Sequence, residues 1–325
     1  MTLPDMKRLE GLSWKPMWVT HLGCLQGCLA YLGIEPSDPW FFGGTGHAFV
    51  INISEDVCPS GPTAWNTMML HRLGENLGYS VERVFGQKNQ PGFEEKREAA
   101  RGLVERSIDG GYPCYGWELE QPEFYTINGY DDRGCYYSGP LCDEGRGPKP
   151  WDEFGMSDIG IMEVYSVKPG EPADDRETVK QALAFALEYS ESPEKWVFTN
   201  YRAGPRGYDN WIRALESGKA SIFGVAYNAA VWSECRDHAV RFLEEAGERL
   251  GGPRSLFDEA VGRYSKVALS LNRVSELFPF TGPRAEGVEV KQANIGEAVH
   301  CLQEARAYEM SGLNSLSTIL EELIE

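Results

Sequence analysis

The sequence predicts an α+β domain over residues 1–168, followed by an all-α helical domain over residues 169–325. Short strand-like runs fill the first half, with a hairpin signal at 131–134, Asp-Asp-Arg-Gly. The Pro/Gly-rich segment 168–172 is typical of a domain boundary. Beyond it, apolar residues such as Val179, Leu183 and Ala186 recur at helical spacing, which indicates a helical bundle.

The first element, within residues 20–33, is predicted to be a helix that carries two thiols. Apolar residues recur at helical spacing up to Leu32, and Gly33 is a natural stop. Cys24 and Cys28 are one turn apart and share a face. The positive end of the helix dipole favours a nucleophilic thiolate near the first turn. The alternative is that both cysteines simply pack into a core.

A glycine-rich segment, 43–46, follows and is predicted to form a tight turn between strand-like runs at 40–42 and 48–53. Glycines there would let the backbone approach a ligand closely, and Thr45 lies among them. His47 follows at the mouth of the turn, either as an acid or base or as an ordinary turn residue. The segment lacks the Gly-Lys-Ser/Thr ending of a phosphate loop.

The next elements are predicted as helices over 65–77 and 92–108, separated by a strand over 79–85. Three short strands between 114 and 137 follow, joined by the hairpin. The 110–117 run reads Gly-Gly-Tyr-Pro-Cys-Tyr-Gly-Trp, and 129–132 reads Gly-Tyr-Asp-Asp.

This order of elements, with Pro-Trp-Asp-Glu-Phe at 150–154, resembles the papain-like fold of the bacteriocin-processing cysteine peptidases. Within that group, it is most similar to the relative that forms the N-terminal domain of the butirosin-biosynthesis acyltransferase. The resemblance covers about residues 14–167. It implies a papain-like architecture for the first domain.

In that family a cysteine opens the first helix, a histidine begins the strand before Gly-Tyr-Asp, and an Asp or Asn on the returning strand orients the histidine. By this resemblance the nucleophile position falls near Thr20 or His21, about one turn before Cys24. Glu123 stands where the histidine is expected, and Ser-Gly-Pro at 138–140 stands where Asp-Pro is expected. The family's catalytic histidine and aspartate positions are therefore not matched in this chain.

We predict a papain-like protein with an altered site, its catalysis lost, that binds a small-molecule or peptidyl ligand in a cleft beside Cys24. Aromatic walls with a few polar groups are typical of such pockets. A carboxylate at Glu123 would raise the pKa of a neighbouring thiol, unlike a histidinium. The candidate ligand-binding residues are His21, Thr45, Trp117, Tyr125, Asn128 and Arg202.

The alternative is a cysteine-dependent hydrolase or acyltransferase. Cys24 would be its nucleophile, His47 or His21 the base, and Glu123 or Asp131 the group that orients the imidazole. Cys24, His47 and Glu123 are therefore the candidate catalytic residues. A structural subunit without a ligand is a third possibility.

The second predicted domain contains weaker indications of a ligand or metal site. Arg202 lies in a loop with two guanidinium groups, which would either receive an anionic ligand or be an ordinary exposed loop. Glu234 and His238 are one helical turn apart, but a metal needs three or four ligands, so a salt-bridged helix face is the simpler interpretation. We expect no metal and no cofactor.

Composition narrows the possible partners and cellular location of the protein. A formal charge of −18 repels nucleic acid and anionic membranes, and no apolar run is long enough to span a bilayer. The eight scattered cysteines and the absence of an apolar signal region predict a cytoplasmic protein with reduced thiols. The expected partner is a small-molecule or peptidyl ligand, and both a monomer and a homodimer remain open.

Overall fold

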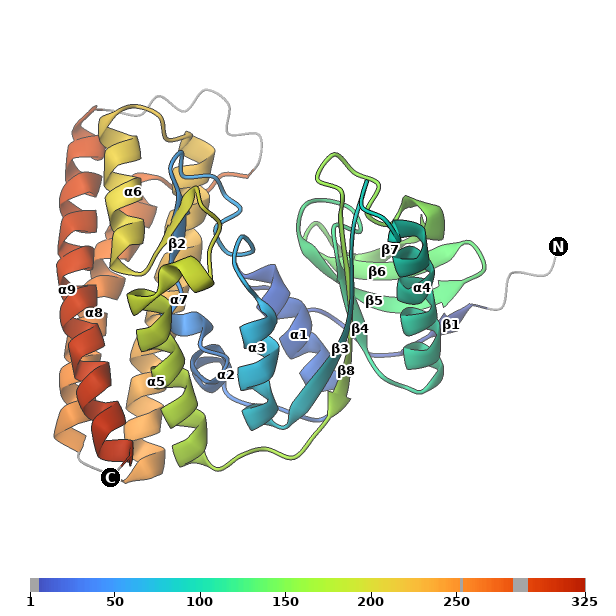
Figure 1. Cartoon of the computed structure of the whole chain (residues 1–325), viewed down its shortest axis with the longest axis horizontal. Coiled ribbons are helices and arrows are strands. Elements are labelled where there is room, and N and C mark those ends of the chain that lie inside the picture. Colours follow the sequence, from blue (N-terminus) through green and yellow to red (C-terminus); the bar gives the residue numbers. More distant parts are fainter. Residues whose placement is uncertain (1–5, 252–253, 283–291, 325) are drawn as a thin grey trace. The chain divides into compact units, whose positions relative to one another are not determined.

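The computed structural model describes residues 6–251, 254–282 and 292–324, and the chain divides into two compact units (Figure 1). The first unit comprises Met1–Glu35 and Gly78–Pro172, and the second comprises Pro36–Leu77 and Ala173–Glu325. The first is α+β and the second is mainly helical, as predicted. The segment Pro36–Leu77 differs from the prediction, because it belongs to the helical unit.

The first unit is built on a seven-stranded sheet with the order β3-β8-β4-β5-β6-β7, in which β1 also pairs with β5. Each of these neighbouring pairs is antiparallel. The strands are β1 (Lys7–Arg8), β3 (Tyr79–Gln87), β4 (Cys114–Trp117), β5 (Phe124–Asp131), β6 (Gly134–Gly139), β7 (Cys142–Pro150) and β8 (Ile161–Pro169). The predicted hairpin at 131–134 is confirmed as the β5–β6 turn.

Helices α1 (Thr20–Tyr31) and α4 (Phe93–Asp109) cover opposite faces of this sheet, as Figure 1 shows. Successive side chains of a strand point to opposite faces. Tyr165 of β8 accordingly lies near His21 of α1, while the next residue, Ser166, accepts a 2.8 Å hydrogen bond from the hydroxyl of Ser107 of α4. The sheet core is therefore enclosed from both sides.

Helix α1 lies against the segment that precedes it, and two glycines make this possible. The amide of Lys15 donates to the carbonyl of Gly23 at 3.0 Å. A Cβ atom on Gly23 would clash with the carbonyl of Lys15, and one on Gly27 would clash with that of Ser13. The glycines one turn apart thus provide a groove along α1 that the backbone of 13–15 fills.

The second unit is a helical assembly with one small two-stranded sheet. The helices are α2 (Asp38–Gly44), α3 (Met68–Gly74), α5 (Asp175–Glu191), α6 (Pro205–Glu216), α7 (Ile222–Leu250), α8 (Arg254–Leu277) and α9 (Gln292–Ile324). Strands β2 (Asn52–Ser54) and β9 (Tyr201–Ala203) pair antiparallel. The long helix α8 packs along both α7 and α9 (Figure 1).

A buried arginine fixes part of Pro36–Leu77 in this unit. Arg236 of α7 donates to the carbonyls of Ala48 and Val50 at 2.9 and 2.8 Å, and its guanidinium pairs with both carboxylate oxygens of Glu309 at 2.8 and 2.9 Å. Tyr208 donates to the same carboxylate at 3.0 Å. The charge is paired and fully hydrogen-bonded, which is the condition for burying an arginine.

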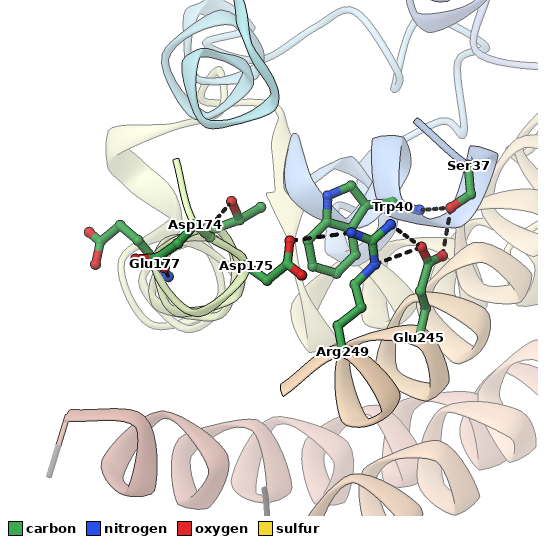
Figure 2. Close-up of polar contacts among 8 residues, drawn as sticks. Ser37, Trp40, Asp174, Asp175, Glu177, Glu245 and Arg249 are labelled. Carbon is green, nitrogen blue, oxygen red and sulfur yellow. Dashed lines mark hydrogen bonds and ion pairs between the residues drawn. The ribbon is translucent and has the colours of Figure 1, made fainter. Parts of the chain in front are cut away.

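A second cluster holds α2 against α5 and α7 (Figure 2). The guanidinium of Arg249 lies 3.9 Å from the ring centroid of Trp40 and pairs with Glu245 and Asp175. Ser37 donates to Glu245 at 2.6 Å and accepts from the amide of Trp40 at 3.1 Å. Helix α2 therefore begins at a capped position that is tied to the C-terminal turn of α7.

Helix α2 corrects the prediction of strand-like structure at 40–42. A short apolar run is compatible with a buried helix as well as a buried strand, and the Ser37 cap followed by Pro39 favours the helix. Residues His47–Phe49 form a 3-10 turn, so the predicted strand at 48–53 shortens to Asn52–Ser54. Among the described helices, none combines the length and apolar character needed to cross a bilayer.

Candidate functional site

Cys24, the predicted nucleophile, lies one turn into α1 and is fully buried. Burial raises the pKa of its thiol well above the ordinary value, and the nearby charge of Glu123 raises it further. Cys28 is also fully buried, its thiol donates to the carbonyl of Cys114 at 3.9 Å, and burial raises its pKa too. Both thiols are therefore held in the protonated, poorly nucleophilic form.

Glu123 belongs to the same unit as Cys24, and its carboxylate contacts Thr20. Thr20 donates from Oγ1 to Oε2 of Glu123 at 2.5 Å, and the same Oγ1 accepts from the amide of Phe124 at 3.2 Å. Thr20 is the first residue of α1, and Glu123 directly precedes β5. The structure thus brings Glu123, which stands where the papain-like resemblance expects the histidine, to Thr20, one of the two residues near which it expects the nucleophile.

The N-terminus of α1 adds a positive potential at this pair. The N-cap residue is Val19, whose side chain offers no acceptor, so no side chain caps the first-turn amides. Such amides, together with the helix dipole, stabilise negative charge beside them. The hydroxyl of Thr20 lies in the half-turn where this effect is largest.

His21 has a structural role in the sheet core of the first unit. Its ring stacks on Phe124 at 4.1 Å between centroids, and its Nε2 lies 3.0 Å from the hydroxyl of Tyr115. Only 2% of the residue is exposed. These contacts account for the position of His21 without a ligand or a role as a base.

His47 is enclosed in the core of the second unit. Its Nδ1 lies 3.5 Å from Sγ of Cys235, and its ring faces Trp65 and Trp232. Burial lowers the pKa of His47 to about 3, and the charge of Arg236 acts in the same direction. The hypothesis that His47 is the base of a thiol site gains no support from these contacts.

Three candidate ligand-binding residues lie on β4 and β5. Trp117 is half-buried, its ring lies 5.0 Å from that of Phe124, and its Nε1 has no hydrogen-bond partner among the described atoms. Tyr125 is fully buried, and its hydroxyl accepts from the amide of Gln121 at 3.2 Å. Asn128 is also buried and donates to the carbonyl of Leu12 at 2.6 Å. Of the three, Trp117 is the best suited to contact a ligand.

The other predicted site residues make local contacts. Thr45 is buried in the second unit and donates to the carbonyl of Phe41 at 2.8 Å. Arg202 lies exposed on β9 and donates to the carbonyls of Thr199 and Tyr201 at 3.0 and 2.9 Å. Each of these side chains therefore stabilises the backbone next to it.

Asp131, predicted as an orienting carboxylate, closes the β5–β6 hairpin. Burial would raise its pKa, but hydrogen bonds from Arg133, Tyr136 and the Arg133 amide hold the pKa at about 2. The carboxylate accepts from the side chain of Arg133 at 2.7 Å and from the Tyr136 hydroxyl at 2.8 Å. Asp131 therefore stabilises the turn, and its contacts do not support a role in orienting an imidazole.

No group of three or more His, Cys, Asp or Glu side chains is placed to hold a metal ion in the described part of the chain. Among known proteins, no family model matches the chain and no curated protein is similar to it in sequence. The geometry around Thr20 is therefore the main indication of a function. In the sequence, only the papain-like resemblance marks Thr20, because a threonine at the start of a helix is also an ordinary structural feature.

Proposed function

We propose that the first unit is a papain-like fold in which Thr20 and Glu123 replace the cysteine and histidine, and that it binds a small-molecule or peptidyl ligand beside Cys24. The observation that carries this proposal is the 2.5 Å hydrogen bond between Oγ1 of Thr20 and Oε2 of Glu123. The element order supports it as well, since the first helix and the strand before Gly-Tyr-Asp supply the two partners.

The groups around this pair suit recognition of a polar ligand with an apolar part. Glu123 is half-buried, and Trp117, the last residue of β4, lies opposite Phe124, the residue after Glu123. The indole N–H of Trp117 is buried and has no hydrogen-bond partner among the described atoms. The half-buried ring of Trp117 lies against the ring of the buried Phe124 and supplies the apolar part of the site. A few directed polar groups on an aromatic surface are the usual composition of a small-molecule site.

The thiol-enzyme alternative has less support. A catalytic cysteine needs access, a lowered pKa and a base within hydrogen-bond reach. Cys24 is fully buried with a raised pKa, and the Nε2 of His21 lies against Tyr115. A ligand-binding site at Thr20 and Glu123 is therefore the better proposal.

A ligand screen tests the proposal directly. We would measure thermal shifts of the full chain with a panel of peptides and polar metabolites, and then repeat them with Glu123→Gln. A true ligand is expected to raise the Tm of the wild type, and the shift should be largely lost in the variant because the carboxylate is gone.

Two matched variants control for indirect effects. Glu120→Gln removes another carboxylate of the same loop, and Cys24→Ala removes the buried thiol. Both should keep the shift. Equal loss in Glu120→Gln and Glu123→Gln, or loss in Cys24→Ala alone, would contradict the assignment.

We also infer a reducing, cytoplasmic setting for the protein. All eight cysteines are free thiols in the structure. Proteins of oxidising compartments commonly join such residues in disulfides.

A further inference from the structure

We propose that Thr20 is a nucleophile and Glu123 its general base, so that the first unit transfers or hydrolyses acyl groups through an acyl-threonine intermediate. This inference goes beyond ligand binding and rests on the site proposed above. It assigns to an oxygen nucleophile and a carboxylate the roles that a thiol and an imidazole have in the fold that the chain resembles.

The hydrogen-bond pattern at Thr20 is the first support. A threonine hydroxyl has one proton to donate and two lone pairs. The proton points at Oε2 of Glu123, 2.5 Å away, and one lone pair accepts from the amide of Phe124 at 3.2 Å. One lone pair is left to attack an acyl carbon, and the Phe124 amide stabilises the oxygen as negative charge develops on it.

The start of α1 is the second support. The reacting oxygen belongs to the first residue of a 12-residue helix whose N-cap side chain provides no hydrogen bond. The positive end of the helix dipole lowers the energy of an alkoxide or a tetrahedral oxyanion beside it. Amides of the first turn are the donors that would stabilise the oxyanion.

Relative exposure is the third support. Thr20 is 8% exposed, whereas Cys24 is completely enclosed one turn further along α1. Glu123 is half-buried. Of these three residues, Cys24 is therefore the least accessible to an acyl group from solvent.

The proposed reaction balances with an acyl ester and water as the only reactants. Oγ1 of Thr20 gives its proton to Glu123 and forms a bond to the acyl carbon, and the ester C–O bond then breaks. Glu123 returns the proton to the departing oxygen, which leaves as an alcohol or phenol. Water, deprotonated by Glu123, next attacks the acyl-threonine, releases the carboxylic acid and restores the hydroxyl, or a second alcohol takes the acyl group instead.

The substrate class follows from the strength of the base. A carboxylate is a much weaker base than the imidazole of a usual nucleophile pair, so it gives less driving force for removal of the hydroxyl proton. Acyl esters with an acidic leaving alcohol, such as phenyl esters, need the least assistance. Unactivated peptide bonds are not expected to react.

The test is acylation of the full chain by p-nitrophenyl acetate, followed by peptide mapping in a mass spectrometer. We expect an acetyl group on Thr20 that resists neutral hydroxylamine, which cleaves thioesters on cysteines but spares oxygen esters. Glu123→Gln should slow the acylation by about 100-fold or more, the usual contribution of a general base.

Two substitutions at Thr20 separate chemistry from folding. Thr20→Val removes the hydroxyl and should abolish the label at this position, while Thr20→Ser keeps the hydroxyl and should retain it. Acetylation confined to cysteines and lysines, or the same p-nitrophenolate release in Thr20→Val as in wild type, would overturn the inference. If ligand binding still depends on Glu123 in that case, the proposed binding function stands and only the nucleophile role is lost.

Discussion

Thr20 and Cys24 differ in reactivity because one turn of α1 separates two environments. Thr20 has a carboxylate partner and a small exposed surface, whereas Cys24 is enclosed and its thiol has a raised pKa. The intrinsic nucleophilicity of a side chain matters less here than access and a base. This is why the more reactive residue type is the poorer candidate in this chain.

Buried His47 makes the second unit sensitive to acid. Its pKa is about 3 in the folded chain and near the ordinary 6.5 in the unfolded one, so between these values only the unfolded chain binds the proton. The burial of His47 does not affect stability above pH 6.5. Between pH 6.5 and about 3, it lowers the free energy of unfolding by about 1.4 kcal/mol for each unit by which the pH falls. His238, with a pKa lowered by burial to about 4, acts in the same direction.

Urea unfolding at pH 7 and at pH 5 measures this effect. The loss of stability between the two pH values should be smaller in His47→Gln than in wild type. His300→Gln is the matched control, because the His300 side chain is 71% exposed. An equal pH dependence in wild type and His47→Gln would show that the burial of His47 does not control the acid response.

At the scale of elements, the approach of residues 13–15 to α1 depends on glycine. We expect Gly27→Ala to destabilise the first unit by about 1–3 kcal/mol, because the added methyl group would clash with the carbonyl of Ser13. Gly102→Ala in α4 is the control, since its nearest neighbour is 3.7 Å away. The control should gain about 0.5–1 kcal/mol from helix propensity. Thermal unfolding in which Gly27→Ala is as stable as Gly102→Ala would refute the close packing.

Within the second unit, Arg236 of α7 connects the 48–50 backbone to Glu309 of α9. Arg236→Met would leave the Glu309 carboxylate buried without its charge partner, at a cost of about 3–5 kcal/mol in urea unfolding. Adding Glu309→Leu should recover part of this loss, because the unpaired charge is then removed. A cost below about 1 kcal/mol for Arg236→Met would mean that the pair is open to water.

Sequence patterns predicted elements better than they predicted which unit an element joins. The helix expected over 92–108 is confirmed as Phe93–Asp109, and the 131–134 hairpin is confirmed. Pro36–Leu77 lies in the second unit and not, as the sequence predicts, in the first, because Arg236 holds it through backbone carbonyls, which leave no signature in a sequence. Likewise, Thr20 gains its importance from a carboxylate 103 positions away.

At the scale of the whole molecule, the division into two units predicts which shortened chains fold. A chain of residues 6–35 and 78–172, joined by a flexible Gly/Ser linker, should give a monomeric first unit. Residues 1–168 as one piece should aggregate, because Trp40 and Phe41 would lack the helices that bury them. Size-exclusion chromatography and circular dichroism compare the two. A well-folded 1–168 chain would contradict the division.

The central claim is that reactivity at this site belongs to a hydroxyl and a carboxylate and not to a thiol. Timed alkylation of the folded chain with iodoacetamide, read by mass mapping of each cysteine, tests it most directly. Cys58, the one cysteine of the eight that is not buried, should be labelled first, and Cys24 should stay unlabelled until urea unfolds the chain. Rapid, stoichiometric labelling of Cys24 in the folded protein would contradict the account.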